Sequence, residues 1–448
     1  MSGSDVQRAD AVYEQLIARA GESWVEPRLD RTAKMLAYLD DPQRTYRVVH
    51  VTGTNGKTST ARMIESLIRA HGLRTGLFTS PHLVRFTERI LIDGEPIADD
   101  AVSDAWNEIE PFISLVDEEL AADGQNPLTF FELLTVLAFV ACADAPVDVL
   151  VLEVGMGGAW DSTNTADGDV AVIAPVAMDH ATRLGETREE IAEVKAGIIK
   201  PGARVVSARQ DAGVAAVLRR VAAEQGAQIA FEGADFALTE RKLAVGGQQV
   251  SFRGLAASYD EDYLPLFGRH QAANAALALA AVESLIGGGE QPIPDDLRAE
   301  GFAETTSPGR LELIGTEPTI VVDAAHNPHG AKALVEALGE SFDMDDWGVV
   351  LGVMADKDIA GIIGELATIA THVFATESDA ERSASADEIA DAAEEQGLRP
   401  TVHPNVVDAM DAARSWAAEG EKRAVLVAGS IVLGGEAIAL ARVEGWKP

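Results

Sequence analysis

The chain is short of cysteine and of basic residues, and each shortage excludes a class of protein. Its single cysteine, Cys142, leaves no partner for an intrachain disulfide and no cysteine cluster for a metal. Only 36 lysine and arginine residues stand against 72 aspartate and glutamate residues, a formal net charge of −36 at pH 7. Nucleic acids and anionic membrane surfaces bind basic faces, so we expect neither as a partner.

Segments that would target or anchor the chain are also absent from the sequence. Residues 1–5 carry no basic patch before an apolar run, so no secretory signal is predicted. The longest apolar stretch, around Leu133–Val151, is interrupted by Asp144 and Pro146, which favours a buried helix followed by a strand over a membrane span. We therefore expect a soluble, cytoplasmic protein.

The excess of acidic residues indicates a particular kind of source. Lysine is scarce, and most of the basic residues are arginine. A surface rich in carboxylates repels itself at low salt and is tolerated when salt screens the charges. We therefore predict a salt-loving, halophilic source.

The remaining composition is that of an ordinary globular protein. The 448 residues are 47% hydrophobic, enough for two or three domains with normal cores. Apolar β-rich runs alternate with helical runs, a pattern typical of a parallel sheet covered on both faces, so we predict an α/β fold. The expected strands are Tyr46–Val51, Val147–Glu153, Val170–Ala174 and Arg204–Ser207. The expected helices are Ser59–His71, Phe131–Ala143, Arg188–Ile199 and Gln271–Ile286.

A second, smaller α/β domain of Rossmann-like type is predicted after a hinge near Ser307–Gly309. We divide the chain there into residues 1–305 and 306–448. Within the first part, residues 226–265 contain short strands and glycine turns and are expected to form an antiparallel edge to the sheet. The second part should contain the strand Thr319–Asp323, the helix Gly330–Leu338, and the strands Gly348–Gly352, His372–Ala375 and Ala424–Ala428.

A phosphate-binding loop follows the first strand. The run Thr52-Gly53-Thr54-Asn55-Gly56-Lys57-Thr58-Ser59 lies between an apolar strand and a helix. Glycines let backbone N–H groups turn toward an anion, and the helix N-terminus adds its positive dipole end. Lys57 supplies a charge for the outer phosphates, and Thr58 offers a hydroxyl to Mg²⁺. Val51 replaces a glycine of the full motif, so this shorter form predicts ATP or GTP and not the reaction.

Two candidate metal ligands follow neighbouring strands. Glu153 ends one apolar strand, and His180 follows the next one along the chain. Carboxyl ends of parallel strands meet at one edge of a sheet, where such sheets bind ligands, and a hard cation prefers oxygen ligands. Either residue alone would be a solvated loop side chain, but together beside a phosphate loop they predict a metal site.

Lys195 lies among apolar neighbours on an amphipathic helix and has two interpretations. It can form an ion pair with a nearby glutamate, or it can point into the nucleotide site. There a neutral amine could react with CO₂ to give a carbamate, an anion able to hold a second Mg²⁺. The residues do not decide between the two.

Together these motifs resemble the Mur ligase superfamily, and within it the dihydrofolate synthase/folylpolyglutamate synthase family. The resemblance covers nearly the whole chain, and its order of motifs is very unlikely by chance. The motifs are GTNGKTS at 53–59, SPHLVRFTERI at 80–90, TFFE at 129–132, LEVGMGG at 152–158, DSTN at 161–164, MDH at 178–180, EVKAGI at 193–198, AANAALALA at 272–280, PGRLE at 308–312, DAAHNP at 323–328 and DKDI at 356–359.

The resemblance implies a reaction of folate biosynthesis and one-carbon metabolism. ATP would phosphorylate a carboxylate, and the amine of L-glutamate would attack the acyl phosphate to give an amide, ADP and phosphate. Residues 1–305 would then be an ATP-binding domain of the Mur ligase central type, and residues 306–448 a glutamate ligase domain.

The resemblance also assigns residues to each part of this site. It gives ATP the residues Thr54, Asn55, Gly56, Lys57, Thr58, Asn274, Arg310 and Asp323. It gives two Mg²⁺ ions the residues Ser80, Glu153, His180 and Lys195, the last as a carbamate. It lines a pterin pocket with Thr129, Phe130, Phe131, Glu132, Trp160, Asp161 and Ser162. The catalytic candidates are Lys57, Lys195, Arg310 and His326. Without the resemblance, Asn274 would read as a packing residue and Arg310 as a surface ion pair.

One position departs from the family pattern. Relatives usually carry Gly-Gly-Arg-Leu-Asp where this chain has Ala159 and Trp160 before Asp161. We expect the change to remove a positive group near the substrate pocket, for which Arg28, Arg31 and Arg85 could substitute.

The leading hypothesis is therefore a monomeric ligase that adds glutamate to dihydropteroate, to tetrahydrofolate, or to both. The alternatives are a related amide ligase with another carboxylate acceptor and a nucleotide-binding switch without ligase activity. The second domain argues against a switch, because Arg310, Asp323 and His326 would then have no task.

Overall fold

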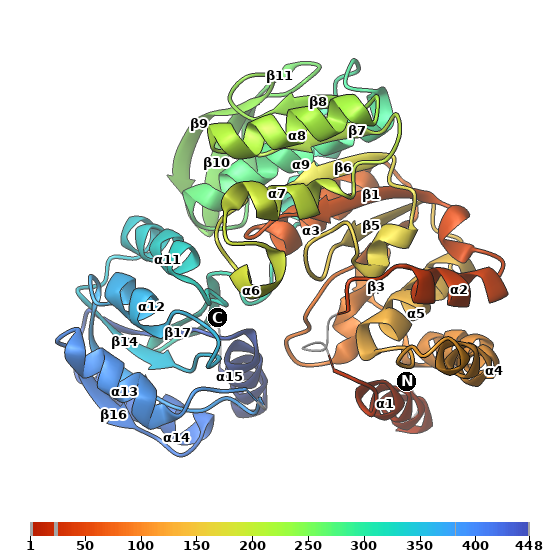
Figure 1. Ribbon diagram of the computed structural model, residues 1–448. Helices are drawn as coiled ribbons and strands as arrows, with labels where there is room; N and C mark the ends of the chain where they lie inside the picture. The colour runs from red at the N-terminus through yellow and green to blue at the C-terminus, as the bar shows by residue number, and fades with distance from the viewer. Residues whose placement is uncertain (1–2, 22–25, 381, 447–448) are drawn as a thin grey trace.

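The computed structural model describes residues 3–21, 26–380 and 382–446, which form two lobes (Figure 1). Of residues 1–5, on which the prediction of no secretory signal rests, Met1 and Ser2 lie outside the described part of the chain. In Figure 1 the larger lobe is coloured red to green and the smaller lobe cyan to blue. Among these residues, no helix combines the length and the apolar character that crossing a membrane requires.

The larger lobe is built on an eight-stranded sheet of order β4-β3-β2-β5-β1-β6-β7-β8. All neighbours from β2 to β8 pair in parallel, whereas β3 and β4 form an antiparallel edge. The strands are β1 (Arg47–Thr52), β2 (Thr75–Phe78), β3 (Ile90–Ile92), β4 (Glu95–Pro96), β5 (Val149–Glu153), β6 (Val170–Ile173), β7 (Arg204–Ser207) and β8 (Gln228–Phe231).

Helices cover both faces of this sheet because side chains alternate between the faces along each strand. Along β1, Val49 and Val51 pack in a cluster with α3 and α9, whereas Val48 packs in a second cluster with α5. One face carries α3 (Lys57–Ala70), α9 (Arg269–Gly287) and α10 (Asp295–Ala303). The other carries α1 (Gly3–Ile17), α2 (Asp30–Tyr38), α4 (Asp99–Ala122), α5 (Phe130–Asp144), α7 (Arg188–Ala196) and α8 (Ala212–Glu224). Short helices are η1 (Pro42–Arg44), η2 (Phe86–Arg89), η3 (Ser162–Thr165) and α6 (Ala181–Leu184).

The predicted antiparallel edge over residues 226–265 is wrong. β8 joins the sheet in parallel, and β9 (Ala237–Ala244), β10 (Gly247–Arg253) and β11 (Ser258–Leu264) form a separate antiparallel sheet of order β11-β10-β9. Val250, Phe252 and Leu264 are buried in the cluster that contains α3 and α9. This small sheet therefore covers helices and does not extend the large sheet.

The smaller lobe has a six-stranded sheet of order β12-β13-β17-β14-β15-β16, parallel except for β12. Its strands are β12 (Glu312–Thr316), β13 (Thr319–Val322), β14 (Asp346–Leu351), β15 (Ala370–Ala375), β16 (Arg399–Val402) and β17 (Arg423–Ala428). One face packs against α11 (Pro328–Ser341), α12 (Ile359–Leu366) and α13 (Ala386–Glu395), and the other against α14 (Val406–Ala418) and α15 (Ile431–Glu444). The predicted α/β class is confirmed in both lobes, and the division between residues 305 and 306 falls between α10 and β12.

Candidate active site

A cavity of about 1000 Å³ lies between the lobes and receives side chains from both. All the residues that the sequence and the resemblance single out line it. They are Thr54, Asn55, Gly56, Lys57, Thr58, Ser80, Thr129, Phe130, Phe131, Glu132, Glu153, Trp160, Asp161, Ser162, His180, Lys195, Asn274, Arg310, Asp323 and His326. Residues far apart in the sequence thus meet in one place, while their individual roles stay predictions.

The phosphate loop joins β1 to the N-terminus of α3. Gly56 has a φ of 82°, and a Cβ atom there would lie 2.7 Å from Oδ1 of Asn274. Only glycine accommodates both the left-handed backbone and this close approach. Nζ of Lys57 donates to the carbonyl of Thr54 at 3.4 Å, a bond that closes the loop on itself. The free N–H groups at the start of α3 face the cavity, which is a geometry suited to phosphate.

Glu153 lies at the end of β5, directly beside the phosphate loop. Its side chain is 1% exposed, and Oε1 accepts a hydrogen bond from Oγ1 of Thr58 at 2.9 Å. Burial raises the pKa of this carboxyl, although Lys57 and the hydroxyl of Thr58 oppose the change. Oε2 is buried, and no atom of the described part of the chain is in hydrogen-bonding geometry with it. An unpaired carboxylate oxygen at this point fits a cation or a water bound to one.

His180 does not join Glu153 in a preformed cluster. Among the residues that the structure describes, no three His, Cys, Asp or Glu side chains lie close enough together to hold a metal ion. His180 instead lies beside Asp179, and burial lowers its pKa to about 4, so the ring is neutral at pH 7. A neutral imidazole remains able to donate a lone pair to a ligand.

Lys195 is 3% exposed and points toward the phosphate loop. Its Nζ donates to the carbonyl of Gly53 at 2.7 Å, and within the described residues it forms no ion pair with a glutamate, which was one of the two interpretations from the sequence. Burial, with Lys57 nearby, lowers the pKa of this amine to about 7. A substantial fraction of the side chain is then neutral near pH 7, as carbamate formation requires.

Three residues of the smaller lobe enter the cavity from the segment around β12 and β13. Asp323 is buried, and its two oxygens accept from the backbone N–H groups of Leu311 and Ala325 at 2.9 and 2.8 Å. Burial raises the pKa of Asp323, and Arg310 opposes this rise. Arg310 also lines the cavity, and its charge opposes the rise in the pKa of Glu153.

His326 lies in a group of ionisable residues shared by the lobes. Its Nδ1 donates to the carbonyl of Ala324 at 2.9 Å, which leaves the lone pair on Nε2. Burial and Lys357 lower the pKa of His326 to about 4. Lys357 crosses from the smaller lobe to Asp179 with an Nζ to Oδ1 distance of 3.0 Å. Burial disfavours ionisation of Asp179, but His180 and Lys357 outweigh it and lower its pKa to about 2.

The far end of the cavity is aromatic and belongs to the larger lobe. Thr129 and Glu132 form the capping box that begins α5, with a distance of 2.8 Å between the N of Thr129 and Oε2 of Glu132. Asp161 is buried and accepts from the N–H of Met156 at 2.9 Å. These hydrogen bonds hold the start of α5, which carries Phe131, and the loop that carries Trp160 at the cavity wall.

The sequence interpretation missed several side chains in this region. Arg89 and His82 line the cavity, and Nε of Arg89 donates to Nδ1 of His82 at 2.7 Å. The guanidinium carbon of Arg89 lies 5.3 Å from the centre of the Phe130 ring, and Tyr13 packs edge-on against His82. Arg89 and His82 stand inside the quoted motif at 80–90, Asp179 inside the motif at 178–180 and Lys357 inside the motif at 356–359, so these motifs were the available signal. Tyr13 lies outside every quoted motif.

The effect of Ala159, where the resemblance places an arginine, stays a prediction. Ala159 does not line the cavity but packs against Gly197, and its N–H donates to the carbonyl of Val194 at 2.8 Å. Two of the expected substitutes are engaged elsewhere, Arg31 with Glu26 and Arg85 with Asp99. Arg28 alone of the three lines the cavity, where Arg89 is the buried positive group.

Two family models match the chain, and together they span both lobes. The Mur ligase middle domain matches residues 51–282, and the Mur ligase, glutamate ligase domain matches residues 309–431. With a phosphate loop in one lobe and a second lobe across the cavity, the protein is a Mur-type ligase.

Individual relatives narrow this class. A dihydrofolate synthase/folylpolyglutamate synthase of Mycobacterium tuberculosis is 41% identical over 95% of this chain and 92% of its own length. The structure of Mycobacterium tuberculosis folylpolyglutamate synthase complexed with ADP has a TM-score of 0.93 at 41% identity, covering 99% of this chain and 100% of that one. The structure of Escherichia coli FolC in complex with DHPP and ADP has a TM-score of 0.84 at 28% identity, covering 97% of this chain and 98% of that one. The chain belongs to the dihydrofolate synthase/folylpolyglutamate synthase family.

Proposed function

We propose that this protein is an ATP-dependent amide ligase that joins L-glutamate to dihydropteroate, to tetrahydrofolate and its glutamylated forms, or to both. One observation carries the proposal: a single cavity contains a phosphate loop, an aromatic acceptor region and a group of ionisable residues from the second lobe. The relatives named for these two activities support it.

ATP binds across the lobes in this proposal. Thr54–Thr58 hold its phosphates, with backbone N–H groups and the ammonium of Lys57 facing the negative charge. Asn274, Arg310 and Asp323 hold the rest of the nucleotide. Arg310 stabilises the charge that develops on the transferred phosphoryl group in this proposal, because it lines the same cavity as the phosphate loop.

The acceptor carboxylate is phosphorylated and then attacked by the amine of glutamate. Thr129–Glu132 and Trp160–Ser162 orient the pterin, and Arg89 offers a positive charge among the aromatic side chains. His326 lines the cavity, and its Nε2 is not used in the bond to Ala324, so it can contact the acyl phosphate or the incoming glutamate. Positioning supplies most of the rate, since the two substrates must meet in one orientation.

Magnesium fits one part of this cavity. The unpaired Oε2 of Glu153, with the hydroxyls of Thr58 and Ser80, is an oxygen-rich set of the kind that hard cations prefer. His180 and a carbamylated Lys195 would hold a second ion. When bound, such ions neutralise phosphate charge.

The acceptor is identified by an assay of ADP release. The purified protein is given ATP, Mg²⁺ and L-glutamate at high salt, with dihydropteroate, tetrahydrofolate or neither. We expect glutamate-dependent ADP release with at least one of the two acceptors. Turnover only with an unrelated carboxylate would indicate another ligase of the superfamily, and absence of turnover with every acceptor would indicate a nucleotide switch.

The working form of the enzyme follows from the same proposal. We infer a monomer acting in the cytoplasm of a halophilic cell, with domains at residues 1–305 and 306–448. The monomer is supported by the fact that one chain supplies every candidate residue of the cavity.

A further inference from the structure

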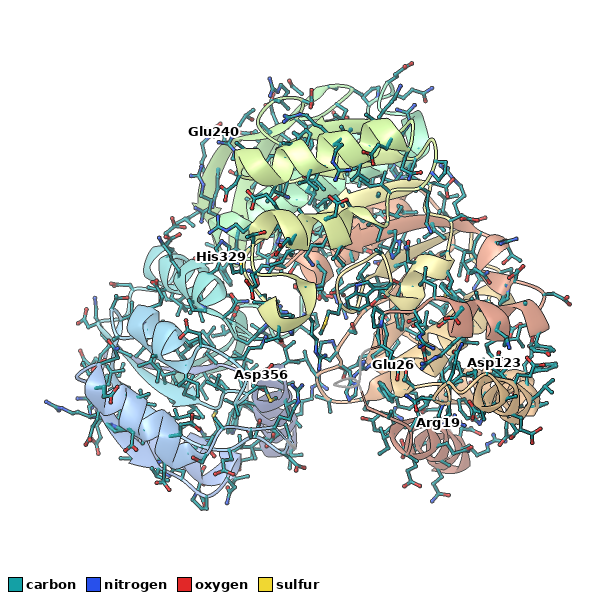
Figure 2. The ribbon with its side chains drawn as sticks, viewed as in Figure 1. Arg19, Glu26, Asp123, Glu240, His329 and Asp356 are labelled. Atoms are coloured by element: carbon teal, nitrogen blue, oxygen red, sulfur yellow. The ribbon has the colours of Figure 1, made fainter. Side chains whose placement is uncertain are left out.

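Asn55 belongs to the phosphate loop, but its side chain is bonded to the smaller lobe. Its Nδ2 lies 3.0 Å from Nδ1 of His329, and its Oδ1 accepts from Nδ2 of Asn327 at 3.2 Å. An amide nitrogen only donates, so Nδ1 of His329 accepts and carries no proton. Both polar atoms of the Asn55 side chain are therefore occupied by the other lobe. Figure 2 shows His329 where α11 faces the larger lobe.

The two partners of Asn55 come from the first turn of α11. Asn327 is the N-cap of this helix, with its Oδ1 accepting from the N–H of Gly330 at 2.8 Å, and it is 6% exposed. A buried cap fixed by its own helix is a rigid partner. His329 is exposed, so the second bond lies at the edge of the contact.

The neighbouring loop side chains behave differently. Oγ1 of Thr54 bonds to the carbonyl of Ala177 at 3.0 Å, and Thr58 bonds to Glu153. Together with Lys57, which bonds to the loop itself, these side chains stay within the larger lobe. Ser59, the last residue of the loop run, bonds to Ser307 near the hinge, with an Oγ to Oγ distance of 2.8 Å. Asn55 is the residue of Thr54–Thr58 whose side chain is bonded to the first turn of α11, while its backbone remains part of the phosphate loop.

We propose that Asn55 is a positioning residue that ties the phosphate loop to the docked smaller lobe. Asn327 follows His326 directly, so a bond between Asn55 and Asn327 fixes the distance between the nucleotide loop and the imidazole of His326. This inference rests on the proposed function and adds to it that the Asn55 amide serves docking and not phosphate binding. Small misplacements of reacting groups cost rate and leave binding intact.

The first test is a split between turnover and nucleotide binding. Asn55→Ala should lower kcat by at least about tenfold while the Kd for ADP stays within about threefold, because the backbone contacts to phosphate remain. His329→Ala should lower kcat in the same direction, and it removes an exposed side chain that the fold does not need. Asn55→Ala combined with His329→Ala should be no slower than Asn55→Ala alone, since both remove one contact.

Asn327→Ala removes the docking bond and a helix cap together, so it needs a matched control. Asn405 caps α14 in the same lobe by the same bond, to the N–H of Asp408 at 2.9 Å, and it does not line the cavity. Asn327→Ala and Asn405→Ala should lose comparable thermal stability, but only the first should lose turnover.

The outcomes separate this inference from the proposed function. If Asn55→Ala weakens ADP binding by the same factor as it lowers kcat, the amide contacts phosphate and the inference is overturned. Unchanged kcat in Asn55→Ala and His329→Ala would also overturn it. If the wild type has no folate-dependent turnover, the proposed function fails. Small-angle scattering in the presence of ADP still tests the inference about Asn55. The wild type should then be more compact than Asn55→Ala, and equal dimensions of the two proteins would refute the inference.

Discussion

At the scale of single residues, we expect phosphate binding to depend on the charge of Lys57. Lys57→Ala should lower kcat by about 100-fold to 1000-fold, the usual cost of losing one group that stabilises transition-state charge. The melting temperature should change little, because the hydrogen bond that the ammonium makes to the carbonyl of Thr54 in its own loop is long, at 3.4 Å. Lys332→Ala, which removes an exposed lysine of α11, is the control for charge alone. Turnover that survives in Lys57→Ala would remove Lys57 from the phosphate site.

Lys195 tests the carbamate. Lys195→Ala should lose most of its activity, and short carboxylates such as acetate should restore part of it by taking the place of the carbamate. The measurement is ADP release with and without added carboxylate. Failure of every carboxylate, with an unmodified amine in a high-resolution map obtained under CO₂, would leave Lys195 as a hydrogen-bond donor to Gly53.

His50 predicts a pH dependence of folding. It is fully buried on β1, its Nε2 lies 3.0 Å from Oγ1 of Thr163, and burial lowers its pKa to about 3. The folded state therefore keeps His50 neutral while the unfolded state takes up a proton below about pH 6.5. The free energy of unfolding should fall as pH drops from about 6.5 toward 3, by at most about 1.4 kcal/mol per pH unit.

A neutral replacement isolates this contribution from the many carboxylates. As the pH falls from 6.5 to 4.5, the free energy of unfolding of His50→Gln should drop by about 2–3 kcal/mol less than that of the wild type. Urea unfolding of both proteins at one salt concentration measures the difference. Parallel pH profiles would mean that His50 is already protonated in the folded state.

Sequence patterns identified residues with a chemical reason of their own and missed residues that matter through a contact. Lys57, Glu153 and Lys195 were predictable because a glycine loop, a strand end or an apolar helix marks each one. Asp179 and Lys357 stand in the motifs at 178–180 and 356–359, but no local pattern indicates that they pair with each other, at 3.0 Å, across the two lobes. The direction of Ala159 was equally hidden, because backbone geometry decides which side of a loop faces a cavity.

At the scale of elements, the start of α3 depends on Gly56. Gly56→Ala should lower the free energy of unfolding by about 1–2 kcal/mol for the left-handed backbone, and it should also weaken ADP binding because the new Cβ atom would meet Asn274. Gly72, at the other end of α3, has a φ of 75° and open space around it. Gly72→Ala should therefore show the stability loss alone. Calorimetry measures the ADP affinity of the two variants. Equal affinities would show that the phosphate loop tolerates a Cβ atom at position 56.

Central strands were easier to predict than the elements around them. Apolar runs located β1, β5, β6 and β7 because strands covered on both faces bury every side chain. The helix α3 begins at Lys57 and not at Ser59, because Gly56 ends the loop with a left-handed residue. The prediction for residues 226–265 was wrong for a physical reason. The alternation of apolar and polar residues shows that one face of a sheet is buried, but it does not show whether helices or another sheet cover that face.

At the scale of the whole molecule, the net charge of −36 predicts dependence on salt. The melting temperature should rise between about 0.1 M and 1 M KCl, as the screening length falls from about 10 Å to about 3 Å. Sucrose is the control, because it also favours the compact state but does not screen charge. A melting temperature that stays constant across this KCl range would refute the halophilic assignment.

The division into two lobes was predictable, but their docking was not. Glycine and proline punctuation after the long helix marked a boundary, and a second set of strands implied a second sheet. Docking depends on a few side chains that meet across the cavity, such as Asn55 with Asn327 and Lys357 with Asp179. No local pattern in either lobe encodes which residue of the other it will contact.

The polypeptide passes from one lobe to the other only once in the described residues, between α10 and β12. This single short connection keeps the smaller lobe at a local concentration on the order of millimolar beside the larger lobe. Each contact between the lobes can then be weak, and the contacts together still hold the smaller lobe against the larger one. Because these contacts are weak, the lobes can separate quickly and release the nucleotide product. Product release then need not limit turnover.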